Sequence, residues 1–142
     1  MSFTSEVKNE VSKLDTMTLE NVTELSAICR NIGNVTKTSL KITTENAAVA
    51  RRIFNLIKET YFVTCKTTVR RGYNFTKNYI YILEIHSKQK EIIEDLNLKN
   101  NIPEEYMYAD ESLKRAYLRG VFLSCGSIND PKKSRYHLEF IV

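Results

Sequence analysis

The chain has 142 residues, of which 42% are hydrophobic and 27% charged, and its formal net charge is +4. This length bounds the chain at one ordinary domain with a substantial core, and the composition is that of a globular protein. No apolar run approaches the length of a membrane span, and no apolar signal region is present at the N-terminus.

The positive charge is concentrated in the middle third of the chain. Residues 1–44 carry five basic and five acidic residues, residues 45–90 carry nine and three, and residues 91–142 carry seven and nine. Such a concentration attracts a phosphate backbone through counterion release without sequence specificity. A solvated basic face explains it equally well, so both interpretations stay open.

The cysteines and histidines do not form the patterns of a metal or disulfide site. Cys29, Cys65 and Cys125 are odd in number, far apart and never in a CxxC pair. Each lies in an apolar stretch, which indicates buried free thiols in a reducing cytosol. His86 and His137 fall at strand positions without companion ligands. We therefore expect no metal and no other cofactor.

The first third of the chain alternates between helical and extended patterns. Apolar residues at helical spacing predict helices over residues 3–14 and from about residue 18 to residue 32. Gly33 is expected to end the second helix in the left-handed conformation. A small hairpin over residues 35–43 follows.

The basic middle third predicts a helix followed by a longer hairpin. Residues 44–46 start a helix whose basic side chains, Arg52 included, mostly avoid its apolar face. Residues 64–71 and 78–86 form the hairpin, in which Lys66, Thr68 and Arg70 share one face. Its tip, from Arg71 to Lys77, is basic and aromatic.

The last third begins the same pattern again. Ser87 is expected to cap a short helix that ends before Pro103. A longer helix runs from Asp110 to about Ser124 and is ended by Gly126, and a strand over residues 135–142 follows. Only the first helix and first strand of the second round are predicted, and we expect a fragment of a longer protein.

Two stretches of the chain, residues 24–35 and 116–128, align with each other: Leu25 with Leu118, Ala27 with Gly120, Gly33 with Gly126, and Val35 with Ile128. Gly120 and Ser124 are four residues apart and therefore share one helix face. Small residues let two helix backbones approach closely. We predict that the two helices pack through Ala27, Gly33, Gly120, Ser124 and Gly126.

Both stretches resemble the LAGLIDADG helix of homing endonucleases, present twice as in their single-chain forms. The resemblance implies an α+β fold with a saddle-shaped antiparallel sheet, built from one αββαββ(α) repeat over about residues 18–100 and a second that begins at about residue 110. In those enzymes an acid before the final glycine binds a catalytic metal ion. Ile32 and Cys125 hold these positions here, and neither suits magnesium, which prefers oxygen ligands. We expect no nuclease activity.

Residues 1–8, 44–52, 114–131 and 136–139 resemble the bacterial WhiA family more closely. Proteins of that family combine a degenerate LAGLIDADG domain with a C-terminal helix-turn-helix domain, which we expect to lie outside this chain. The resemblance implies a transcription regulator tied to sporulation, or to cell division and chromosome segregation. It also implies a cytoplasmic, nucleoid-associated location, with no membrane and no small-molecule substrate.

Two functions stay open on this scaffold. The first is weak, non-specific binding of double-stranded DNA, in which phosphates contact the polar sheet face and the basic hairpin tip through Lys41, Lys66, Arg70, Arg71 and Lys77. The second is an interaction module for the transcription machinery or a division protein. Charges gathered on the concave sheet would favour DNA, and scattered charges would favour a protein partner.

Overall fold

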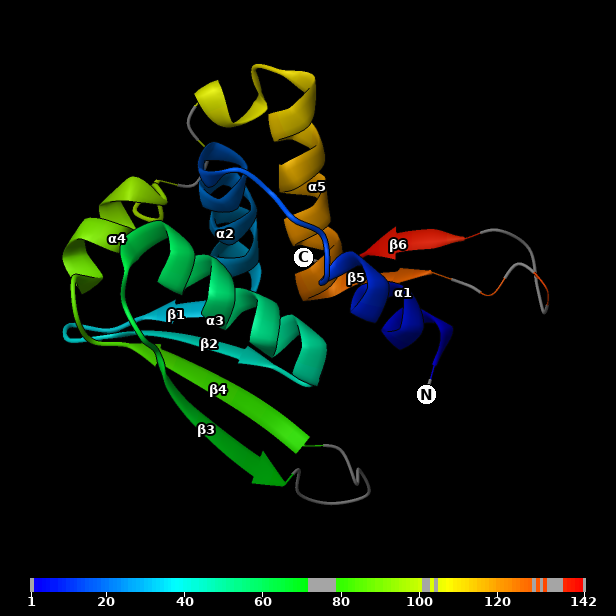
Figure 1. Ribbon diagram of the computed structural model, residues 1–142, viewed down its shortest axis with the longest axis horizontal. Coiled ribbons are helices and arrows are strands. Elements are labelled where there is room, and N and C mark those ends of the chain that lie inside the picture. Colours follow the sequence, from blue (N-terminus) through cyan, green and yellow to red (C-terminus); the bar gives the residue numbers. More distant parts are fainter. Residues whose placement is uncertain are drawn as a thin grey trace.

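The structure is a computed structural model that describes residues 2–71, 79–100, 105–128 and 137–141, with Pro103, Asp130 and Lys132. Its elements are, in chain order, α1 (Phe3–Val11), α2 (Thr18–Ile32), β1 (Gly33–Val35), β2 (Leu40–Thr44), α3 (Ala47–Tyr61), β3 (Lys66–Arg71), β4 (Tyr79–Ile85), α4 (Gln89–Asp95), the 3-10 helix η1 (Glu105–Tyr108), α5 (Glu111–Cys125), β5 (Gly126–Ile128) and β6 (Leu138–Phe140). The α2 and α3 helices lie on one side of a four-stranded sheet, α5 stands beside α2, and a two-stranded sheet lies farther along (Figure 1).

The four-stranded sheet is antiparallel, with the strand order β1-β2-β4-β3. Burial alternates along β2, where Leu40 and Ile42 are buried and Lys41 is exposed. Leu83 and Ile85 of β4 are buried on the same side, beneath the helices. Since side chains of a strand alternate between the two faces, the apolar face forms the core and the opposite face is left to solvent.

The helix α2 is buried along most of its length, with every residue from Asn21 to Cys29 buried. It packs against α3 and the sheet on one side and against α5 on the other. A helix surrounded in this way has no solvent face, so its polar side chains need partners inside the protein.

Two of the three longest helices begin at side-chain caps in the positions that the sequence predicts. The Oδ1 atom of Asn46 accepts from the amides of the second and third residues beyond it at 2.9 and 3.0 Å. Asp110 accepts from the Ser112 amide at 2.7 Å. The predicted Ser87 cap is wrong, because α4 follows Lys88 in the left-handed conformation, with φ 57°, and has no side-chain cap.

Two other expectations at helix ends are also wrong. The first helix ends at Val11, and Leu14 lies beyond it, 51% exposed, with its carbonyl accepting a hydrogen bond from Arg52 of α3. Gly33 and Gly126 are extended, with φ −91° and −86°. Space explains these glycines better, since a Cβ on either would lie 2.5 Å from an atom of the preceding helical turn.

The second repeat contains both strands of its first hairpin, whereas the sequence predicted one. Gly126 pairs with Phe140, and Ile128 pairs with Leu138. A three-residue strand is too short to show alternation, which explains why β5 was missed. Leu138 of β6 is 54% exposed, whereas Leu40 of β2 is fully buried. Within the described residues, no helix is both long and apolar enough to cross a bilayer.

Candidate nucleic-acid interface

Three of the predicted cationic residues lie on one face of the four-stranded sheet. Lys41 of β2 and Lys66 of β3 both stand opposite Glu84 of β4, and Arg70 stands opposite Ile80. The side chains of Lys41, Lys66 and Arg70 therefore point away from the buried side of the sheet, where Leu83 and Ile85 of β4 lie. We call the side to which they point the outer face, and it consists of Lys41, Thr43, Lys66, Thr68, Arg70, Ile80, Ile82 and Glu84.

Glu84 is the one carboxylate of the outer face and lies between two lysines. Its carboxylate is 3.8 Å from Lys41 Nζ and 2.9 Å from His86 Nε2. The hydrogen bond with His86, followed by the charge of Lys41, holds the pKa of Glu84 below its usual range. Three cations against one carboxylate leave the outer face positive, as a phosphate-contacting surface requires.

The other two predicted cations are not gathered on this surface. Arg71 pairs with Tyr79, and because it follows Arg70 directly in the strand, it lies on the opposite side of the sheet, the side of the helices. Lys77 lies outside the described residues, as do the rest of the predicted tip and the start of the predicted last strand. Within the described part of the chain, the outer face therefore contains three of the five cations that the sequence predicted for DNA contact.

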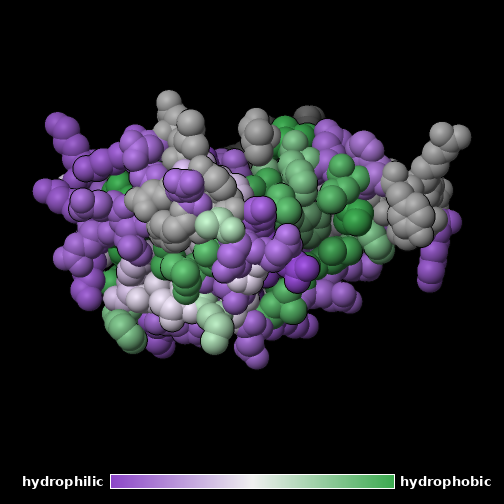
Figure 2. Space-filling view, turned by 90° about the horizontal axis from the view of Figure 1, so that it is seen from above, coloured by the Kyte–Doolittle hydropathy of each residue, from purple (hydrophilic) through white to green (hydrophobic). Residues whose placement is uncertain are grey.

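Apolar side chains also occur on the outer face and elsewhere on the surface. Ile80 and Ile82 are half-buried between the cations. Met17 and Leu118 are 76% and 55% exposed, on the segment before α2 and on α5. Seen from above, apolar surface gathers to the right of centre, whereas the left side is mainly hydrophilic (Figure 2). These groups offer contact area to a protein partner.

The two motif helices, α2 and α5, meet through small residues. A Cβ on Gly120 would overlap the Glu24 carbonyl oxygen and lie 2.8 Å from Ala27 Cβ. Closer to the sheet, Asn31 Nδ2 donates to Ser124 Oγ at 3.2 Å. The close approach thus depends on a missing side chain at residue 120, and Gly33 and Gly126 lie beyond it, where each helix passes into a strand.

The C-terminal ends of the motif helices, where α2 and α5 pass into strands, carry no acidic residue. Ile32 packs against the hydrophobic core, and Cys125 donates its thiol to the Val121 carbonyl at 3.1 Å. Among the described residues, no group of three or more His, Cys, Asp or Glu side chains is placed to hold a metal ion.

A buried ion network joins the three main helices, and the sequence did not predict it. Glu24 of α2 is fully buried and accepts from Arg52 Nε at 2.5 Å and from Arg119 Nε of α5. Arg52 was expected on the polar side of α3 but is 5% exposed. The one available signal was a carboxylate within the apolar stretch of a motif helix.

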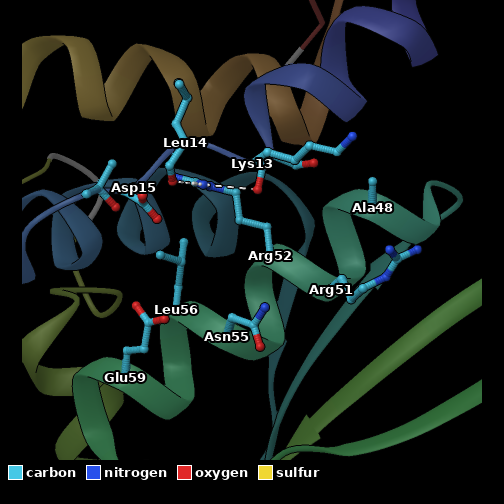
Figure 3. Close-up of a pocket in the computed structure, with 11 residues that line it drawn as sticks. Lys13, Leu14, Asp15, Ala48, Arg51, Arg52, Asn55, Leu56 and Glu59 are labelled. Carbon is cyan, nitrogen blue, oxygen red and sulfur yellow. Dashed lines mark hydrogen bonds between the residues drawn. The ribbon is translucent and has the colours of Figure 1, made fainter.

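Arg52 also fixes the segment between α1 and α2. Its Nη1 donates to the carbonyls of Ser12 and Leu14 at 3.1 and 2.7 Å. Figure 3 shows the side chain directed from α3 toward this segment, at the edge of a pocket of about 340 Å³. The pocket wall carries charges of both signs, from Arg51 and Lys13 but also from Asp15 and Glu59, and so favours no ligand class.

Family models match two parts of the chain. The model of the WhiA N-terminal LAGLIDADG-like domain matches residues 18–99, and that of the WhiA LAGLIDADG-like domain matches residues 114–142. The chain is 40% identical over 148 residues to the probable cell division protein WhiA of Staphylococcus saprophyticus and 42% identical over 150 residues to that of Bacillus pumilus. Each alignment covers 98% of this chain and 47% of the relative, so the chain spans about half the length of these curated relatives.

Solved structures show the same fold. The crystal structure of the N-terminal LAGLIDADG domain of DUF199/WhiA matches with a TM-score of 0.76 and 25% identity, over 98% of this chain and 65% of that one. Full-length DUF199/WhiA from Thermatoga maritima matches with a TM-score of 0.73 and 25% identity, over 99% of this chain and 44% of that one. These matches confirm the predicted LAGLIDADG-like fold class.

Proposed function

Because the chain belongs to the WhiA family, we propose that it is a non-catalytic domain that binds double-stranded DNA within a transcription regulator of cell division, chromosome segregation or sporulation. Its curated relatives carry the name probable cell division protein. The proposal places the protein on the nucleoid.

The observation that carries this proposal is the positive outer face. Lys41, Lys66 and Arg70 come from two strands, yet they share one exposed side of the sheet. Cations on a regular surface contact phosphates and orient a protein on a duplex without reading its bases. Weak binding that depends strongly on salt is therefore expected.

The absence of catalysis is supported by the residues at the helix ends. Phosphodiester hydrolysis with a metal requires carboxylates that hold the ion and activate water. Ile32 cannot bind a metal ion, and the Cys125 thiol is a poor ligand for magnesium. The same scaffold can still hold a duplex, because phosphate contact needs no metal.

The test is a titration of the chain with a generic duplex across a salt series, with magnesium present and cleavage monitored. Each phosphate contact contributes about 0.9 to the slope of log affinity against log salt. Replacing Lys66 and Arg70 with alanine should weaken binding of all sequences alike and lower the slope by about two. A matched control replaces Lys58 and Lys90, two exposed cations on α3 and α4.

Unchanged binding in the Lys66 and Arg70 double variant would reject the outer face as the site. Equal losses in the control variant would mean that total charge, and no particular surface, attracts the duplex. Cleavage of the duplex would reject the non-catalytic proposal.

The apolar residues of the outer face and of α5 favour a second function, an interaction module for the transcription machinery or a division protein. Ile80 and Ile82 interrupt the cations of the outer face, and Leu118 is exposed on α5. Such surfaces suit a protein interface better than a phosphate backbone. No duplex binding even at low salt would support this alternative.

A further inference from the structure

A second polar site lies between α1, the turn from β2 into α3, and the C-terminal end of α5. This α1–α5 pocket has a volume of about 370 Å³. Lys8 is the one cation of its lining and Glu45 the one carboxylate. Hydroxyl groups supply most of the remaining polar lining: Thr4, Ser5, Thr43, Thr44 and Ser124.

Lys8 lacks a counter-ion within the described part of the chain. No carboxylate there lies within ion-pair distance of its ammonium group, which stands 5.7 Å from the centre of the Phe122 ring. Burial lowers the pKa of Lys8, and the nearby Cys125 opposes that shift. A half-buried ammonium without a carboxylate partner gains free energy when an anion enters the pocket.

Two hydroxyl groups of the pocket, those of Ser5 and Thr44, donate to no other group among the described residues and can donate to such an anion. Ser5 Oγ accepts from the Ser2 hydroxyl at 3.1 Å, and Thr44 Oγ1 accepts from the Asn46 amide at 3.2 Å. Each of these oxygens therefore keeps its own hydrogen for another acceptor. The Ser124 hydroxyl already donates to a carbonyl of its own helix and is not available.

We propose that the α1–α5 pocket binds a single phosphate group, with Lys8 supplying the charge and Ser5 and Thr44 donating hydrogen bonds. This proposal rests on the proposed function, because we assign the phosphate to the backbone of duplex DNA. Thr43 lines the pocket and also belongs to the outer face. The backbone of a DNA strand bound on that face can therefore continue into the pocket. Glu45 disfavours a second negative charge, so a phosphodiester fits better than a dianionic phosphate.

The experiment compares Lys8→Gln and Lys8→Arg with Lys90→Gln, a matched loss of an exposed lysine on α4. Duplex affinity is measured across a salt series, and the amide NMR shifts of Ser5 and Thr44 are followed in titrations with a short duplex and with inorganic phosphate. Lys8→Gln should lower affinity at least threefold and reduce the salt slope by about one. Lys8→Arg should restore both, and Lys90→Gln should change neither.

The two sources of phosphate give different results. Shifts of the pocket amides with the duplex at low concentration, lost in Lys8→Gln, support a DNA backbone phosphate. Shifts with inorganic phosphate alone, with unchanged duplex affinity in Lys8→Gln, keep the pocket as an anion site but overturn its assignment to DNA. No Lys8-dependent shift with either probe overturns the pocket altogether.

The proposed function and this inference fail separately. A parent chain that binds no duplex at low salt rejects the function, while the inorganic phosphate titration still tests the pocket. Duplex binding that is intact in Lys8→Gln and lost in the Lys66 and Arg70 double variant overturns the assignment of the pocket to DNA and leaves the proposed function standing. Thermal unfolding of each variant identifies any loss that comes from instability, and Lys8→Arg remains the decisive comparison in that case.

Discussion

The contact between the motif helices can be tested with one methyl group, by replacing Gly120 with alanine. In a solvent-exposed helix this change stabilises by about 1 kcal/mol, because alanine has the higher helix propensity. At residue 120 the added Cβ would overlap the Glu24 carbonyl oxygen and lie 2.8 Å from Ala27 Cβ. Carbon atoms in contact prefer about 3.5–4.0 Å, so the two helices must separate by roughly 1 Å.

The overlap outweighs the gain in propensity. Overpacking a well-packed interface costs about 1–3 kcal/mol, and backbone atoms of the facing helix cannot move aside as a flexible side chain can. Separation of the helices also stretches the bond from Arg119 to Glu24. We expect Gly120→Ala to lower the free energy of unfolding by about 1–2 kcal/mol, or the melting temperature by roughly 3–8 °C.

Urea unfolding followed by circular dichroism measures this change, and Lys114→Ala, an exposed site on the same helix, is the control. The control should stay within about 0.5 kcal/mol of the parent chain. Equal or greater stability of Gly120→Ala would refute the reasoning, since it would mean that α2 and α5 do not touch at this residue.

Other perturbations give equally direct tests. Glu24→Gln leaves two guanidinium groups without their buried carboxylate and should cost about 3–5 kcal/mol of stability in urea unfolding, whereas a cost below 1 kcal/mol would argue against the ion network. Glu84→Gln removes the carboxylate of the outer face and should raise duplex affinity by up to about fivefold, and weaker binding would contradict a role for that face. Burial raises the pKa of Cys29 to about 12 and of Cys65 to about 11, so at pH 8 the half-exposed Cys125 should react first with a thiol reagent. The raised pKa values of these two thiols also mean that their contribution to stability is fully present below about pH 9 and is lost above it, because the unfolded chain releases these protons first; unfolding free energies that stay level between pH 9 and pH 11 would reject this.

Local sequence signals determined the element order and the alternation of the sheet. Asn46 and Asp110 are short-range caps, and their bonds reach amides two or three residues away. The placement of Lys66, Thr68 and Arg70 on one face of β3 follows from the two-residue period of a strand. The repeated motif predicted which two helices contain the small residues that face each other.

Tertiary structure alone decided the features that depend on contacts between distant residues. Along the chain, Arg52 is 28 residues and Arg119 is 95 residues from Glu24. Only the packing of three helices brings the two guanidinium groups to the carboxylate. The same holds for Lys8, whose surroundings are built from α1 and α5. Pattern reasoning treats a charged residue as solvated unless its partner is near in sequence, and a buried charge is stable only because the fold supplies a partner from elsewhere.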